Sequence, residues 1–244
     1  MQFFEGRNYR INKILLSCVG QWPYQTNRSS NAIIIIIVSL AGTQFIAKIC
    51  GLFSIDNIDL FIDSLSPLVV DIGCGVKLIT CILKATEIRA LFDQIQYDWQ
   101  LLITSSQIKI LNNYAQNGRT FTIIYANFFK FLLKNYFLIL YSNSNIHIIC
   151  FFITVKYILS AFYSALVLFM LVPLQSLLLG SSSNDTTRLL LHQVEYYIDM
   201  EKYYLPILIH GYVTAVICVS IAIAADTMYV IVVQHVCGLF MIIG

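Results

Sequence analysis

The sequence predicts an all-α membrane protein, a bundle of apolar helices, and three observations support this fold class. Only 11% of the 244 residues are charged, while 58% are apolar and the mean hydropathy is +0.75; a soluble domain carries about 25% charged residues. Apolar runs of about 20 residues recur along the chain, and a helix of that length crosses a hydrocarbon core about 30 Å thick. Lipid admits only helices or closed barrels, because backbone groups find no water there.

Composition and motifs exclude several other classes of protein. A formal net charge of +2 and the lack of a basic cluster argue against a nucleic-acid binder. No metalloprotease, hydrolase or nucleotide-binding motif occurs in the sequence, so we expect no enzyme activity and no cofactor. The seven cysteines show no metal-ligand spacing such as C-x-x-C. Five of them lie inside apolar runs, where a reduced thiol behaves as a small hydrophobe: Cys50, Cys74, Cys81, Cys150 and Cys218.

The first two apolar runs predict the first two membrane spans. Residues 32–53 contain five consecutive isoleucines and are too long for the apolar part of a signal peptide, so this run is predicted to be a signal anchor. Residues 66–86 form the second predicted span, with Pro67 in its first turn, where the missing N–H costs little. The polar residues 87–119 have apolar positions at a spacing of three to four. This pattern predicts an amphipathic helical segment, either a hairpin or an extension of the second span.

The second half of the chain holds one long apolar region and one long predicted helix. Residues 121–179 are apolar apart from a short polar break, with a membrane helix expected near 160–179, and a loop is expected at 180–203. Residues 205–244 predict the fourth span and an extension, about 60 Å long if wholly helical and so twice the hydrocarbon thickness. Asp226 is then expected at or beyond the inner interface, where its charge costs little.

Lysine and arginine counts in the short flanks predict the orientation of the chain. Residues 1–31 hold four of these cations, whereas the loop at 54–65 holds none and carries three aspartates. The N-terminus is therefore expected in the cytoplasm, together with residues 87–119. The glycosylation sequon at Asn27 then lies on the wrong face, while the one at Asn184 is usable if its loop is external.

A few ionisable groups lie inside the predicted spans, and each such group is a candidate functional site. We favour the interpretation that Lys77 faces the bundle interior or extends to the interface, and that it supports packing. Lys48 lies near the end of the first span and is expected to extend outward. His210, Asp226 and His235 resemble a catalytic or metal-binding triad. The helix between the two histidines separates them by about 40 Å, too far for a shared site.

Two tyrosine pairs flank the start of the fourth span, Tyr196-Tyr197 and Tyr203-Tyr204. Tyrosine is enriched where a membrane meets water, so an aromatic belt is the expected role. Tyrosines also line cavities that bind small apolar ligands, and both roles stay open.

Four stretches of the sequence together indicate a family resemblance: none is decisive alone, but four in the same order are unlikely to arise by chance. They are GQWPYQ (20–25), SLSPLVVDIGCGVKLITC (64–81), DQIQYDWQLL to ILNNYAQNGRTFTIIYA (93–126) and, the most specific, VEYYIDMEKYY to CGLFMIIG (194–244). With these stretches the chain resembles the insect odorant receptor family, most closely the expanded receptor set of ants and other Hymenoptera. The resemblance covers most of the chain outside residues 128–160.

The resemblance implies a seven-helix membrane protein with a cytoplasmic N-terminus, the orientation that the charge count gives independently. It also implies a subunit of an odorant-gated cation channel, assembled as a hetero-tetramer with a co-receptor in the plasma membrane of sensory-neuron dendrites. The implied ligand is a volatile odorant, and membrane lipid surrounds the helices. Subunits of this family associate through a packing core, and the inner part of the fourth span of this chain resembles that core.

The chain departs from the family pattern in two places. It stops at Gly244, after the fourth span, so this sequence does not include the fifth to seventh spans, which supply the pore and one wall of the odorant pocket. Residues 128–160 do not resemble the family, and 21 of these 33 residues are Phe, Ile, Lys, Asn or Tyr, which A/T-rich codons encode. A retained, translated intron that splits the third span is our hypothesis; a genuine additional, fifth span is the alternative.

An odorant pocket is expected between the outer halves of the second, third and fourth spans, since pockets for volatiles are mostly apolar. Depth in the membrane alone selects its candidate lining residues: Val69, Val70, Gly73, Tyr163, Leu208, Tyr212 and Val213. Because one wall of the pocket and the pore are not in this sequence, we expect the 244-residue chain neither to bind an odorant nor to conduct.

A small polytopic transporter or an accessory membrane protein is the alternative function. The sequence shows no clear inverted repeat with Gly- or Pro-broken segments, which argues against a transporter. The predicted external loops carry no cysteines to hold them, which argues against a tetraspan scaffold.

Overall fold

The structure is a computed structural model that describes residues 2–135, 190 and 193–243. All regular elements in these ranges are helices, as the composition predicts. The membrane helix expected near 160–179, most of the segment 128–160, Tyr163 and Asn184 lie outside the described residues. In chain order the elements are the 3₁₀-helix η1 (Gln2–Glu5) and the α-helices α1 (Arg10–Cys18), α2 (Asn27–Phe53), α3 (Ile58–Leu83), α4 (Ala85–Leu101), α5 (Ser105–Asn135) and α7 (Tyr204–Ile243).

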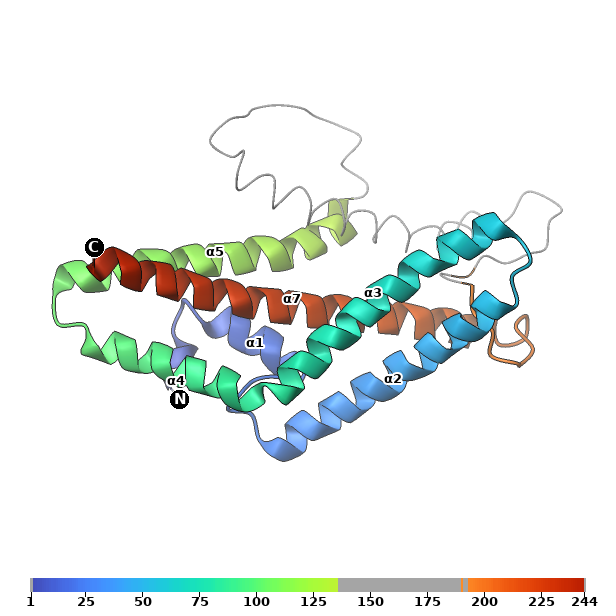
Figure 1. The fold of residues 1–244 in the computed structure, drawn as a ribbon, viewed down its shortest axis with the longest axis horizontal. Helices are drawn as coiled ribbons and strands as arrows, with labels where there is room; N and C mark the ends of the chain where they lie inside the picture. Colours follow the sequence, from blue (N-terminus) through green and yellow to red (C-terminus); the bar gives the residue numbers. More distant parts are fainter. Residues whose placement is uncertain (1, 136–189, 191–192, 244) are drawn as a thin grey trace, which may run out of the picture.

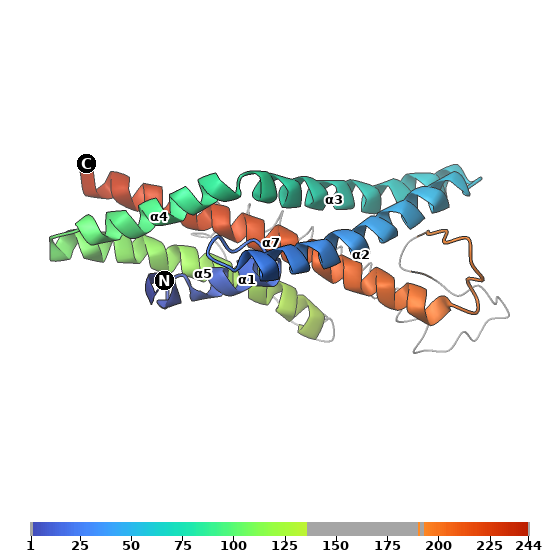
Figure 2. The ribbon, with the colours of Figure 1, turned by 90° about the horizontal axis from the view of Figure 1, so that it is seen from below.

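Helix α7 is the axis of the molecule and runs along nearly its whole length (Figures 1 and 2). It is one unbroken helix of 40 residues, which at 1.5 Å per residue extends about 60 Å. Its bounds match the helix expected over residues 205–244, and a hydrocarbon core takes up only about 30 Å of it. Helices α1, α2, α3 and α5 all pack against it. The longest apolar run of the sequence therefore positions the rest of the described fold.

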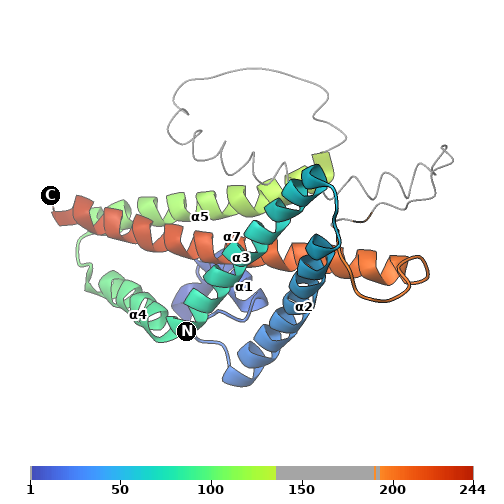
Figure 3. The same cartoon turned by 45° about the vertical axis from the view of Figure 1, so that its right-hand side comes forward.

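Three helices among the described residues are long and apolar enough to cross a membrane, namely α2, α3 and α7. Helices α2 and α3 form an antiparallel pair that crosses α7 (Figure 3). Large apolar side chains on this pair point away from the bundle and are exposed, for example Ile36, Val69 and Ile79. Exposed apolar surface of this extent is expected of helices that face lipid.

Helix α3 begins eight residues before the expected start of the second span at residue 66. Helix α3 starts at Ile58 and ends at Leu83, so Pro67 lies well inside the helix and not in its first turn. Its N-cap is Asn57, whose side chain accepts a hydrogen bond from the N–H of Asp59 at 2.9 Å. An asparagine cap and an acidic first turn stabilise a helix start. These effects outweigh the polar character that made residues 58–65 resemble a loop.

Residues 87–119 form parts of two helices rather than one segment. Helix α4 follows α3 after a break at Lys84, and α5 folds back along α7 (Figure 1). Of the two arrangements expected, α4 corresponds to the extension of the second span, while α5 packs mainly on α7. Helix α5 continues without interruption to Asn135, through the residues where the polar segment gives way to the apolar region.

Residues 2–26 fold against the bundle. Phe4 and Trp22 pack on Phe92 of α4, with ring centroids 5.4 Å apart in both pairs. Gly20 makes the turn after α1 at a φ of +73°, and a Cβ there would lie 2.9 Å from the carbonyl oxygen of Ser30. Only glycine adopts this backbone conformation without strain. The N-terminal segment is thus a packed part of the fold.

The close approach of residues 193–195 to α2 gives a first testable prediction. A Cβ at Gly51 would lie 2.8 Å from the carbonyl oxygen of Gln193 and 2.9 Å from the Cα of Val194. We expect Gly51→Ala to push this segment away and break the hydrogen bond from the Glu195 N–H to the Ala47 carbonyl oxygen, 2.9 Å long. Overpacking of this kind costs about 1–3 kcal/mol. Limited proteolysis within residues 193–203 measures the effect.

Gly42→Ala is the matched control on the same helix. A Cβ at Gly42 meets nothing within 4 Å, and alanine favours a helix over glycine by about 0.5–1 kcal/mol. We therefore expect unchanged proteolysis in this variant. Equal cleavage of the two variants would contradict the close packing of this segment against α2.

Candidate functional site

Polar side chains contact α7 at four successive levels, and together they are the candidate functional site of the described fold. The first three levels lie within helices that are otherwise strongly apolar. A polar group in such surroundings is costly unless it has a partner, and intramembrane ionisable groups are functional candidates. The α7 residues at the four levels are His210, Cys218, Asp226 and His235.

The first level links the segment before α7 to α2. The hydroxyl of Tyr196 donates to Gln44 Oε1 at 2.5 Å and also lies 2.6 Å from His210 Nδ1. His210 Nε2 lies 3.1 Å from the carbonyl oxygen of Leu40. Gln44 is buried, with 3% of its surface exposed. The tyrosine therefore satisfies two polar groups that the surrounding apolar side chains cannot.

Removal of this hydroxyl gives a second prediction. Tyr196→Phe leaves Gln44 and His210 without this partner, and an unsatisfied buried polar group costs about 1–3 kcal/mol. We expect a lower thermal midpoint of the purified protein and faster hydrogen exchange in residues 193–203. Tyr197→Phe is the control, because Tyr197 is 80% exposed. A similar loss in both variants would contradict the role of the Tyr196 hydroxyl.

The second level is a buried ion pair between α2 and α3. Lys48 Nζ lies 2.7 Å from Asp71 Oδ2, and the exposed fractions of the two side chains are 7% and 18%. Lys48 was expected to extend outward to the interface; the structure shows instead that it turns inward to a carboxylate. The thiol of Cys218 on α7 lies 3.8 Å from the other Asp71 oxygen. Pairing with Asp71 removes the need for Lys48 to reach water.

The third level joins α3, α5 and α7 through one carboxylate. Lys77 Nζ lies 2.6 Å from Asp226 Oδ1, and the hydroxyl of Tyr125 donates to Asp226 Oδ2 at 2.9 Å. Lys77 therefore faces a neighbouring helix of the bundle, one of the two placements expected for it. Asp226 does not stand alone at an interface, since it is held by a cation and a hydroxyl from two other helices.

The fourth level lies near the C-terminal end of α7. His235 Nε2 is 2.8 Å from Asp98 Oδ2 of α4, and both side chains are buried, at 5% and 12% exposed. His210 and His235 thus have different partners, and Asp226 contacts neither of them in the hydrogen bonds of the described residues. No group of three or more His, Cys, Asp or Glu side chains suited to a metal occurs within residues 2–135, 190 and 193–243.

Two tyrosines of the N-terminal segment have shifted pKa values. Burial raises the pKa of Tyr9 to about 12, although the hydrogen bond from Trp99 Nε1 acts in the opposite direction. Burial and the nearby carboxylate of Asp93, which accepts a hydrogen bond from Tyr24, raise the pKa of Tyr24. Both phenols therefore stay protonated and act as hydrogen-bond partners at neutral pH.

The structure describes six of the seven predicted odorant-pocket residues, on α3 and α7. Val69, Gly73 and Val213 are exposed on the outer surface of α3 and α7, and a Cβ at Gly73 would meet nothing within 4 Å. Val70 and Tyr212 are half-buried, and Leu208 is buried at 4% exposed. Tyr163 lies outside the described residues. Of the described candidates, three therefore lie on exposed helix surface and three are buried or half-buried where α3 and α7 pack in the bundle.

The sequence already held a signal for the ion pairs. Asp71 and Asp226 lie in apolar runs, and so do the cations Lys48 and Lys77. Opposite charges within spans commonly pair with one another. The sequence does not show which lysine pairs with which aspartate, because that depends on how the helices pack.

Comparisons of the chain with models of known protein families, with curated proteins and with solved structures found no match.

Proposed function

We propose that this chain is part of an insect odorant receptor subunit, a component of a channel that opens when a volatile odorant binds; on its own the 244-residue chain is expected neither to bind the odorant nor to conduct. The subunit acts together with a co-receptor in the plasma membrane of olfactory sensory neurons. Its N-terminus is cytoplasmic and four spans of the family pattern are present, the third falling within residues 121–179. The proposal joins the resemblance of the four sequence stretches to one structural observation, the length and environment of α7.

The observation that carries the proposal is that α7 is about twice as long as a membrane needs. Its C-terminal half packs against α4 and α5 yet still exposes large apolar side chains. Tyr229 is 69% exposed, Val236 43% and Phe240 71%. Apolar surface outside the hydrocarbon core is typical of a surface that another protein covers. A receptor subunit that assembles through this part of α7 explains both its length and its exposed surface.

The distribution of charge supports the proposed orientation. Lys84 lies between α3 and α4, and Arg89 lies in the second turn of α4. Figure 1 shows the N-terminal segment, which contains Arg10, beside this end of α3. The opposite end of α3 carries Asp59 and Asp63 and no cation before Lys77. Because cations are enriched in cytoplasmic flanks, this asymmetry favours a cytoplasmic N-terminus.

The site of expression tests the proposal against its alternative. An odorant receptor subunit is expected in a small set of antennal sensory neurons, in their dendrites, and always beside the co-receptor. In situ hybridisation and an antibody to the N-terminal segment measure this. Expression in many tissues without the co-receptor would contradict the proposal.

A small polytopic transporter is the second candidate, and the two ion pairs within the spans favour it. Paired charges such as Lys77 and Asp226 are common along ion and substrate pathways. This candidate predicts solute uptake into proteoliposomes that Asp226→Asn abolishes. The receptor proposal predicts no such uptake by the parent protein or by the Asp226→Asn variant.

A further inference from the structure

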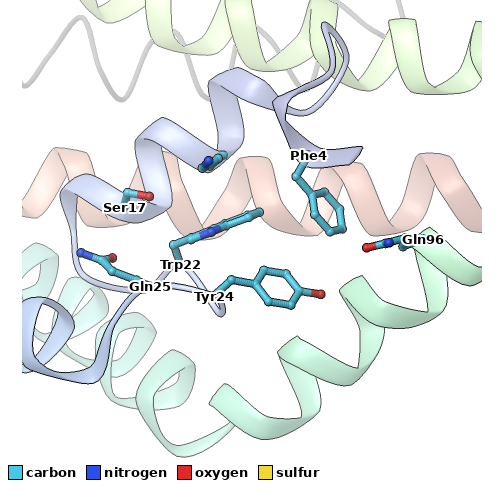
Figure 4. Close-up of a pocket in the computed structure, with 7 residues that line it drawn as sticks. Phe4, Ser17, Trp22, Tyr24, Gln25 and Gln96 are labelled. Carbon is cyan, nitrogen blue, oxygen red and sulfur yellow. The ribbon is translucent and has the colours of Figure 1, made fainter. Parts of the chain in front are cut away.

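A hollow of about 270 Å³ lies between α1, the turn that follows it, and α4. In Figure 4 the rings of Trp22 and Tyr24 lie side by side, with Ser17 and Gln25 on one side and Phe4 and Gln96 on the other. The hollow thus has an aromatic middle and polar groups at its edges. Its lining residues are Phe4, Lys13, Ser17, Trp22, Tyr24, Gln25 and Gln96.

One polar atom beside the hollow lacks a partner. Gln25 donates from Nε2 to Ser29 Oγ at 3.0 Å, while its Oε1 is buried and accepts no hydrogen bond within the described structure. A buried acceptor without a donor is destabilising, and a native protein rarely keeps one empty. The hollow therefore suits a ligand that donates a hydrogen bond to Gln25. Ser17 and Gln96 add further polar groups to its edge.

Two cations and two carboxylates lie near the hollow. Lys13 lines it, and the guanidinium of Arg89 lies 5.3 Å from the ring centroid of Tyr24. Two carboxylates are also close, since Glu5 pairs with Lys13 and Asp93 accepts from Tyr24. The Glu5 side chain is 54% exposed, and an exposed ion pair of this kind contributes little. An anionic ligand can therefore replace Glu5 at Lys13 at small cost.

The depth of the hollow identifies where such an anion comes from. Residues 22–25 directly precede α2, whose apolar run starts at Ala32. The hollow is therefore at the boundary between hydrocarbon and water on the N-terminal side, the level of phospholipid headgroups. Tryptophan and tyrosine are the residues enriched at this level. Arg28, exposed in the first turn of α2, adds a cation there.

We propose that the hollow binds the headgroup of an anionic phospholipid that carries hydroxyl groups, of the inositol type. Its phosphate lies against Lys13, and one of its hydroxyls donates to Gln25 Oε1. Clusters of Lys and Arg near a membrane surface attract such anionic headgroups. The inference goes beyond the proposed function and does not depend on it, because it requires only that α2 crosses the membrane.

Lipid binding by the purified full chain tests this site. Native mass spectrometry of the protein in detergent compares short-chain phosphatidylinositol, phosphatidylcholine and free inositol phosphate. We expect phosphatidylinositol to bind best. Lys13→Gln should weaken its binding about tenfold, since a charge-assisted hydrogen bond is lost, and Gln25→Leu about threefold. Both variants should keep the helical circular dichroism of the parent.

Two control variants separate the hollow from general effects. Arg7→Gln removes an exposed cation of the same segment that does not line the hollow, and Ser29→Ala removes the partner of Gln25 Nε2 but keeps Oε1. Both should bind phosphatidylinositol like the parent. An equal loss in Arg7→Gln and Lys13→Gln, or binding of phosphatidylcholine as strong as that of phosphatidylinositol, would overturn the site. Free inositol phosphate that binds as tightly as the lipid would overturn the lipid assignment.

Discussion

Replacing Asp71 by leucine is expected to destabilise the protein more than any other single substitution within the spans. The change leaves the ammonium of Lys48, 6% exposed, without its carboxylate in an apolar environment. Removing one partner of a buried ion pair typically costs about 3–5 kcal/mol. We expect a large drop in the yield of folded protein and in its thermal midpoint in detergent, measured by circular dichroism.

The double variant Lys48→Met with Asp71→Leu is the matched control. It removes both charges and keeps side chains of similar size, and replacing a whole buried pair by apolar residues is often neutral. We expect this variant to recover most of the lost stability. A double variant as unstable as Asp71→Leu alone would mean that Lys48 and Asp71 do not depend on each other.

Phe92→Ala is expected to release the N-terminal segment from the bundle. Phe92 is 1% exposed and packs on Phe4 and Trp22 of that segment. Truncation of a buried phenylalanine to alanine costs about 3–5 kcal/mol. We expect rapid protease cleavage within residues 2–26 and loss of near-ultraviolet circular dichroism. Leu91→Ala, at a neighbouring position that is 47% exposed, should leave both unchanged; the same cleavage in this control would contradict the packing of the segment on Phe92.

The long apolar helices could be predicted because their signal is local. The 40 residues of α7 carry a continuous apolar run, and neither Pro206 near its start nor the internal glycines interrupt it. The start of α3 was missed because Asp59 and Asp63 resemble loop residues, although Asn57 provides a recognisable N-cap. Capping signals therefore place helix starts better than hydropathy does in the polar flanks of spans.

The polar contacts could be predicted only in part. Lys77 was recognised as a group that needs an explanation, but its partner Asp226 lies 149 residues away in sequence. The link from Tyr196 to Gln44 and His210 joins three separate segments in the same way. Such pairings depend on the rotation of each helix about its axis, which small differences in packing determine. Periodicity in one sequence does not fix that rotation.

Co-purification with the odorant receptor co-receptor tests the proposed function most directly. The two chains are co-expressed, the co-receptor is captured by an affinity tag in mild detergent, and this chain is quantified in the eluate. Two paired variants locate the contact: Tyr229→Ala with Phe240→Ala on the C-terminal half of α7, and Leu205→Ala with Ile209→Ala at its start, where the side chains are 56% and 53% exposed. We predict that the parent and the second variant co-purify and that the first variant does not. Absence of the parent chain from the eluate, or equal recovery of both variants, would contradict assembly through the C-terminal half of α7.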